Sequence, residues 1–139
     1  MSLERCRADA HRWLFQAKAD LKAAGNSLKD GSHEWACFQS QQAGEKALKA
    51  VWYFNVLDPW GHSLVRLIQE YPEDDLRDGL ALLMAQAKRL DKLYIPTRHP
   101  NGLPDLTPSE VYTEQEGEDA ISSAQAILEF VEDALREPS

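Results

Sequence analysis

Apolar side chains recur at steps of three and four residues along most of this chain, which is the spacing of one face of an α-helix. The first stripe predicts a helix over residues 3–30, ended by Gly31. Its members are Leu3, Cys6, Ala10, Trp13, Ala17, Leu21, Ala24 and Leu28. A second helix is predicted over residues 34–57, where Asp58-Pro59 stops it because proline lacks the amide donor.

The middle of the chain predicts two further helices of unequal length. A short helix is expected over residues 63–70, with Ser63 in the N-cap position. After Pro72 the helical spacing returns and predicts a fourth helix that ends near Tyr94. Its stripe consists of Leu76, Leu80, Leu83, Ala87, Leu90 and Tyr94.

Residues 95–112 interrupt the helical pattern before a last helix. Their repeated prolines exclude a regular helix, and a connection this long is often functional. The last helix is predicted to begin at Thr113-x-x-Glu116, a capping box. Because strand-like alternation is missing throughout, we predict an all-α fold in a single domain over residues 1–139. Its architecture would be an antiparallel bundle of four long helices plus one short helix.

The formal net charge of −8 argues against general nucleic-acid binding, because nonspecific affinity comes from neutralising phosphates. The charge is uneven, however, and a basic cluster precedes a long stretch without Lys or Arg. Such a basic spot on an acidic domain suits a small anion better than a long polyanion. The cluster consists of Lys88, Arg89, Lys92 and Arg98.

The cellular compartment is predicted only from features that the sequence lacks. No apolar run approaches the roughly 18 residues that a membrane span needs. The N-terminus lacks the apolar core of a signal peptide. We therefore expect a protein of the cytosol or the nucleus, and of these a cytoplasmic one, with no membrane partner. Cys6 and Cys37 fall at apolar helical positions, which predicts two reduced, packed thiols.

The common sequence patterns of catalysis are missing from this chain. It has neither a glycine-rich phosphate loop nor a nucleophile elbow. Its histidines do not show the spacing of zinc ligands. We therefore expect no catalytic residue, no metal site and no cofactor, and thus a protein that is not an enzyme.

A polar face is predicted within residues 41–49. At about 100° per residue, Gln42, Glu45, Lys46 and Lys49 share one side of the helix. The alternative interpretation is an ordinary exposed face with a Glu45–Lys49 ion pair.

A second unusual segment lies at the predicted helix-to-loop junction, residues 90–101. It gathers an aromatic ring, a hydroxyl group, a cation and an imidazole within a few positions, including Tyr94, Arg98 and His99. The alternative here is a structural turn with Tyr94 in the core.

Four segments together resemble the HEPN family (higher eukaryotes and prokaryotes nucleotide-binding domain) over nearly the whole chain. They stand in the right order and at the right spacing. They are Trp13-Leu14-x-x-Ala17-x-x-Asp20-Leu21-x-x-Ala24; Trp35-Ala36-Cys37-Phe38 followed by Gln41-Gln42-Ala43-x-Glu45-Lys46-Ala47-Leu48-Lys49; Gly61-His62-Ser63-Leu64; and Leu90-Asp91-x-x-Tyr94-Ile95-Pro96-Thr97-Arg98-His99-Pro100.

The resemblance implies a helical bundle that commonly forms a homodimer. In this family such a domain is often a small prokaryotic protein beside a minimal nucleotidyltransferase, or the last domain of the large chaperone-like protein sacsin. It therefore implies a nucleoside triphosphate as ligand and a nucleotidyltransferase or chaperone-type protein as partner.

Many other HEPN members are ribonucleases that use Arg, four to six residues, then His. In this sequence only Arg5 and His11 have that spacing, and they fall in the first predicted helix, whereas the family's motif lies near the loop before the last helix. Within one helix their side chains would also point about 120° apart. This departure favours a noncatalytic module over the ribonuclease alternative.

The predicted function is therefore a noncatalytic dimerising module that binds a nucleotide or another small polyanion. Lys46 and Lys49 could neutralise phosphates, Arg98 offers a planar fork, and Tyr94 could stack a base. His99 completes the candidate site. In the alternative, the domain only binds proteins, and Arg98 and His99 pin the loop to helix carbonyls.

A homodimer is also expected from the large apolar residues, for which a four-helix core has limited room. They are Trp52, Tyr53, Phe54 and Trp60.

Overall fold

The computed structural model describes residues 2–136, and helices make up most of this part of the chain. The all-α prediction is confirmed, while Met1 and residues 137–139 of the predicted domain lie outside the described residues. The helices are α1 (Leu3–Lys29), α2 (His33–Phe54), α3 (Leu64–Gln69), α4 (Asp74–Ala81), α5 (Met84–Asp91), the 3₁₀ turn η1 (Pro100–Gly102), α6 (Pro108–Val111) and α7 (Glu114–Ala134).

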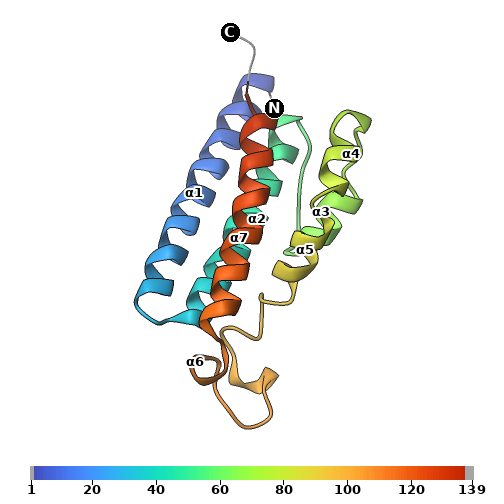
Figure 1. Cartoon of the computed structure of the whole chain (residues 1–139). Helices are drawn as coiled ribbons and strands as arrows, with labels where there is room; N and C mark the ends of the chain where they lie inside the picture. The colour runs from blue at the N-terminus through green and yellow to red at the C-terminus, as the bar shows by residue number, and fades with distance from the viewer. Residues whose placement is uncertain (1, 137–139) are drawn as a thin grey trace.

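The three long helices α1, α2 and α7 form the body of the bundle (Figure 1). Successive segments alternate in direction, so α1 begins and α7 ends at the same end of the molecule. The segment formed by α4 and α5 packs beside them, and the loop from α5 to α7 closes the opposite end.

The helix ends follow from capping residues. Ser2 accepts a hydrogen bond from the backbone amide of Arg5 at the start of α1. Gly31 turns the chain into α2 with φ +81°, a left-handed conformation that glycine adopts without strain. α2 ends at Phe54, three residues earlier than predicted, because Val56 with φ +59° leaves the helix before Asp58-Pro59.

The predicted fourth long helix is instead two short ones, separated at Leu82 and Leu83. Gly79, a weak helix former, lies just before the separation. At the separation the amides of Leu82 and Leu83 donate to the carbonyls of Gly79 and Leu80, three residues earlier. Leu80 and Leu83 are both buried in the core, while Leu82 is 81% exposed. An apolar stripe can therefore be continuous in sequence although the helix is not.

α2 is the central helix, since small residues on it let its neighbours approach closely. Ala36, Ala43, Ala47 and Ala50 are fully buried along it. Gly44 leaves room for Leu64 of α3 and Leu90 of α5, so both segments pack directly on its backbone. This packing positions the start of α3 and the end of α5 beside the polar part of α2.

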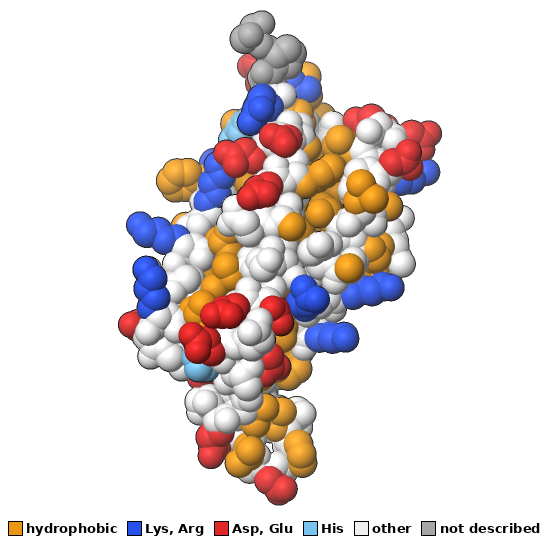
Figure 2. Space-filling model, viewed as in Figure 1, with side chains coloured by type: hydrophobic (Ala, Val, Ile, Leu, Met, Phe, Trp, Pro, Cys, Tyr) orange, Lys and Arg blue, Asp and Glu red, His pale blue; other side chains and the backbone are white. Residues whose placement is uncertain are grey.

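The outer surface agrees with the acidic composition. Acidic side chains lie along α7, and hydrophobic ones are visible between α7 and the α4–α5 segment and over the loop at the end (Figure 2). No described helix has the length and apolar character required to cross a bilayer.

Candidate functional site

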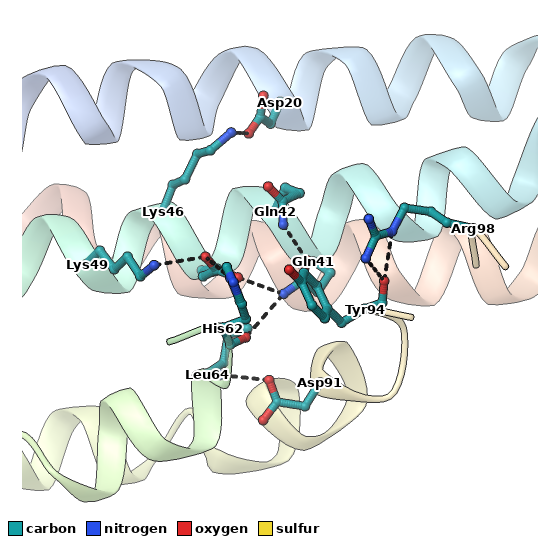
Figure 3. Close-up of polar contacts among 11 residues, drawn as sticks. Asp20, Gln41, Gln42, Lys46, Lys49, His62, Leu64, Asp91, Tyr94 and Arg98 are labelled. Carbon is teal, nitrogen blue, oxygen red and sulfur yellow. Dashed lines mark hydrogen bonds and ion pairs between the residues drawn. The ribbon is translucent and has the colours of Figure 1, made fainter. Parts of the chain in front are cut away.

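A group of polar side chains gathers on the side of α2 that α7 does not cover (Figure 3). We call it the α2 polar site. It consists of Gln41, Gln42, Glu45, Lys46 and Lys49 of α2, together with Asp20, His62, Tyr94 and Arg98.

Glu45 is the centre of this site and is only 5% exposed. Its Oε2 accepts a 3.0 Å hydrogen bond from Lys49 Nζ, and its Oε1 accepts one of 3.1 Å from Gln41 Nε2. Because a buried carboxylate is costly without partners, these bonds fix its position. The ion pair named as an alternative by the sequence is thus present, but it is buried rather than exposed.

Lys46 and Lys49 are both neutralised by carboxylates of the protein itself. Lys46 Nζ donates to Asp20 of α1 at 2.6 Å, with about a quarter of its side chain exposed. The Lys49 side chain is 11% exposed and bonded to Glu45. The two lysines of the candidate site therefore lie together, and Lys46 is the more accessible to a ligand.

His62 joins the site from the turn before α3, and sequence reasoning did not include it among the site residues. Gly61, with φ +86°, makes the turn, and Ser63 caps α3 by accepting from the amide of Arg66. The imidazole Nδ1 lies 3.3 Å from Glu45 Oε2, and its ring stacks on Tyr94 with centroids 4.7 Å apart.

A histidine directly before an N-cap serine was visible in the sequence as Gly61-His62-Ser63. Its partner Glu45 is 17 residues away, so no local pattern could connect the two.

Asp91, the last residue of α5, holds this turn in place. Its carboxylate accepts hydrogen bonds from the amides of Leu64 at 2.7 Å and Val65 at 3.1 Å. It also accepts a 2.8 Å hydrogen bond from the Ser63 hydroxyl. A carboxylate from a neighbouring helix thus complements the N-terminus of α3.

Arg98 folds back on its own loop. Its Nε and Nη2 donate to the carbonyl of Tyr94 at 3.0 and 2.7 Å. Its guanidinium lies over the ring of Phe38 at 4.2 Å and over that of Tyr94 at 4.7 Å. These contacts match the Arg98 part of the alternative in which Arg98 and His99 both pin the loop. His99 is exposed next to η1.

A cavity of about 200 Å³ opens next to His62. Trp60, which is 77% exposed, stands at this cavity. The lining residues are Trp52, Trp60, Gly61, His62, Ser63, Arg66, Leu67 and Glu70.

A model of the HEPN domain family matches residues 10–134 of the chain. The crystal structure of TT1696 from Thermus thermophilus is similar, with 44% identity and a TM-score of 0.83. That similarity covers 90% of this chain and 97% of the other.

Two curated relatives are also similar in sequence. The candidate toxin MJ1304 of Methanocaldococcus jannaschii is 29% identical over 92% of this chain and 89% of its own length. Human sacsin is 33% identical over 69% of this chain, but the match spans 2% of sacsin.

The expectation that the chain is not an enzyme is contradicted by this comparison. MJ1304, to which nearly the whole chain is similar, is named a candidate toxin rather than a binding module. The missing Arg-to-His spacing excluded only one arrangement of catalytic residues. Groups from separate parts of the sequence, such as Glu45 and His62, meet only in the folded chain.

Proposed function

This chain belongs to the HEPN domain family, and on that premise we propose that it is a homodimer that binds a nucleotide or another small polyanion at the α2 polar site. The observation that carries the proposal is the meeting of cations and aromatic rings there. Lys46 and Lys49 come from α2, the stacked rings of His62 and Tyr94 lie beside them, and Arg98 packs against Tyr94. Phosphate groups pair with such cations, and a base stacks on such rings.

The existing ion pairs set the expected affinity. A phosphate at Lys46 has to compete with Asp20, and one near Lys49 meets the charge of Glu45. The free energy gained when a phosphate binds is then the difference between the phosphate–lysine interaction and the carboxylate–lysine interaction that it replaces or weakens. We expect dissociation constants of roughly micromolar to millimolar.

Calorimetric titration with AMP and ATP tests the site. Lys46→Ala should weaken binding about tenfold or more by removing a charge-assisted contact. Lys18→Ala is the matched control, because Lys18 also pairs with a carboxylate, Glu132, at 2.8 Å but on another face. Absence of binding heat at millimolar nucleotide, or equal effects of the two variants, would contradict the nucleotide site. A protein-binding domain without a small ligand would then be favoured.

The homodimer part of the proposal is supported by large apolar side chains on the surface. Phe15 and Trp60 are each 77% exposed, and Leu82 is 81% exposed. In the proposed homodimer a second copy of the chain would cover some of them through an isologous contact. Light scattering should give twice the monomer mass of 15.7 kDa, and monomer mass at high concentration would refute it. A minimal nucleotidyltransferase or a chaperone-type protein is the heterologous partner that we propose.

A second candidate function is cleavage of RNA. It is supported by the similarity to a candidate toxin and by the contact between a buried carboxylate and an exposed imidazole at His62. A pair of this kind is a common device for moving protons. Incubating the chain with a labelled oligoribonucleotide tests it.

A further inference from the structure

A groove runs along the molecule between α1 and α7, and none of the residues that line it belongs to the α2 polar site. It consists of two hollows of about 450 and 420 Å³. Both are lined by Ile121, Gln125 and Glu129, so they form one continuous groove. In Figure 2 hydrophobic side chains lie along this groove, and basic side chains lie on its α1 side.

The floor of the groove is apolar and only partly covered. Leu21 and Leu28 of α1 and Ile121 of α7 line it, and each of them is partly exposed. Gly25 lies between the two leucines on α1, and a Cβ added there would meet nothing within 4 Å. An apolar side chain from a partner therefore has room in the groove and would be removed from water there.

The two walls of the groove carry opposite charges. Lys18 and Lys22 stand on the α1 side, whereas Glu129 and Glu132 stand on the α7 side. Lys18 and Glu132 pair with each other at 2.8 Å. Lys22 and Glu129 have no ion pair among residues 2–136, although Glu129 accepts a 3.0 Å hydrogen bond from Gln125. One cation and one anion on facing walls thus remain for a partner.

We propose that this groove is the contact between two copies of the chain, related by a two-fold axis that runs along the helices. The assignment rests on the homodimer of the proposed function and names its interface. Such an axis keeps every residue at its own level and exchanges the two walls, so α1 of each copy lies over α7 of the other. An axis across the helices would instead set lysines against lysines, which like-charge repulsion disfavours.

The levels along the two helices bring the remaining charges together. The Lys18–Glu132 pair shows which turns of α1 and α7 lie side by side. α1 and α7 run in opposite directions, so Lys22 and Glu129 both lie about one turn further toward the same end of the molecule. In the dimer Lys22 of one copy therefore faces the partner's Glu129, and the symmetry repeats this contact.

Phe15 provides the large apolar side chain for this contact. It is 77% exposed, and it stands seven residues before Lys22, which places it two turns away on the same side of α1. Because it precedes Lys18 by about one turn, its ring then packs on the last turn of the partner's α7. Buried aromatic side chains commonly carry much of the binding energy of an interface.

This arrangement leaves the α2 polar site open in both copies, since that site lies on the side of α2 that α7 does not cover (Figure 3). Each chain should therefore bind AMP with the same affinity whether or not it is part of a dimer.

Sedimentation of the full chain over a range of concentrations tests the interface. Phe15→Asp should raise the dimer dissociation constant about 30-fold or more, the effect of losing a central aromatic contact. Lys22→Glu and Glu129→Lys should each raise it about tenfold by setting like charges against one another. The double variant that carries both reversals should return to the wild-type value, because the exchanged charges attract again.

Two matched variants control for effects unrelated to the groove. Leu82→Asp changes a side chain that is 81% exposed but lies between α4 and α5. Lys88→Glu reverses an exposed lysine of α5. Both should keep the wild-type dissociation constant. All the substituted side chains are exposed, so circular dichroism should show that every variant folds.

The outcomes separate this interface from the proposed function. A dimer that tolerates Phe15→Asp, or single reversals that the double variant does not rescue, overturns the groove as the interface and leaves the homodimer standing. A wild-type chain that is monomeric at every concentration overturns both. A fall of AMP affinity in Phe15→Asp overturns the separation of interface and ligand site. The expected dimer behaviour without any AMP binding supports the groove and contradicts the nucleotide site instead.

Discussion

The carboxylate of Asp91, at the end of α5, accepts a 2.7 Å hydrogen bond from the backbone amide of Leu64, the first residue of α3. This contact joins two residues that are 27 positions apart in the sequence. It fixes the turn that carries His62, because Ser63 donates to the same carboxylate. The position of the imidazole therefore depends on a residue of another helix.

Asp91→Ala should destabilise the fold by about 1–2 kcal/mol, since the amides of Leu64 and Val65 lose their acceptor. Urea unfolding followed by circular dichroism measures this change. Asp74→Ala is the control, because the Asp74 side chain is 92% exposed in its ion pair with Arg77 and should contribute less than about 0.5 kcal/mol. Equal effects of the two substitutions would contradict the role of Asp91.

Two helical glycines should respond oppositely to alanine. A Cβ at Gly44 would lie 2.8 Å from both Leu64 Cδ2 and Leu90 Cδ1, so Gly44→Ala should cost about 1–3 kcal/mol by overpacking. A Cβ at Gly25 has nothing within 4 Å, so Gly25→Ala should stabilise α1 by about 0.5–1 kcal/mol. Urea midpoints of the two variants check both signs, and a stabilised Gly44→Ala protein would show that α3 and α5 pack more loosely.

The fold was predictable from the sequence to the extent that it depends on local spacing. The stripe of α1 and the capping box at Thr113 predicted ends within about a residue or two of the observed helices. The interruption at Leu82 was not predictable, because the leucines on both sides continue one helical spacing. The hydrogen bonds from Leu82 and Leu83 to carbonyls three residues earlier, which mark the interruption, are seen only in the folded chain.

The site was predictable in part for the same reason. Gln42, Lys46 and Lys49 lie on successive turns of α2 (Figure 3), and Glu45 pairs with Lys49 as the helical spacing indicates. Their partners come from distant positions, such as Asp20 for Lys46, and no spacing rule identifies pairs across elements. Glu45, the carboxylate that contacts His62, is buried only in the folded chain, so its burial could not be predicted from the sequence either.

The free energy of unfolding should fall in alkaline solution because the thiol of Cys37 is buried. Burial, and then the charges of Glu116, Glu34 and Asp119, raise the pKa of its thiol from 9.0 to about 12. Between these values the unfolded chain loses the thiol proton and the folded chain keeps it. The free energy of unfolding should therefore decrease as pH rises from about 9 to 12, by up to about 1.4 kcal/mol per pH unit from this group.

Unfolding by urea at a series of alkaline pH values measures this contribution as a difference between variants. Cys37→Ala should lose stability less steeply with pH than wild type. The difference is needed because burial also raises the pKa values of Tyr71, Tyr53 and Tyr112, which contribute in the same direction. Identical slopes for wild type and Cys37→Ala would contradict the linkage.

Arg98 should contribute to both stability and binding, and one variant can separate the two. Arg98→Ala removes two hydrogen bonds to the Tyr94 carbonyl and the contact with the Phe38 ring. We expect a loss of about 1–2 kcal/mol in urea unfolding. Arg98→Lys keeps the charge but cannot reproduce the planar fork, so it should restore only part of that loss. Because the loop that carries Tyr94 would be loosened, AMP affinity measured well below the melting temperature should also fall. An AMP affinity that stays at the wild-type value in Arg98→Ala would remove Arg98 from the nucleotide site and leave it the purely structural role of holding the loop.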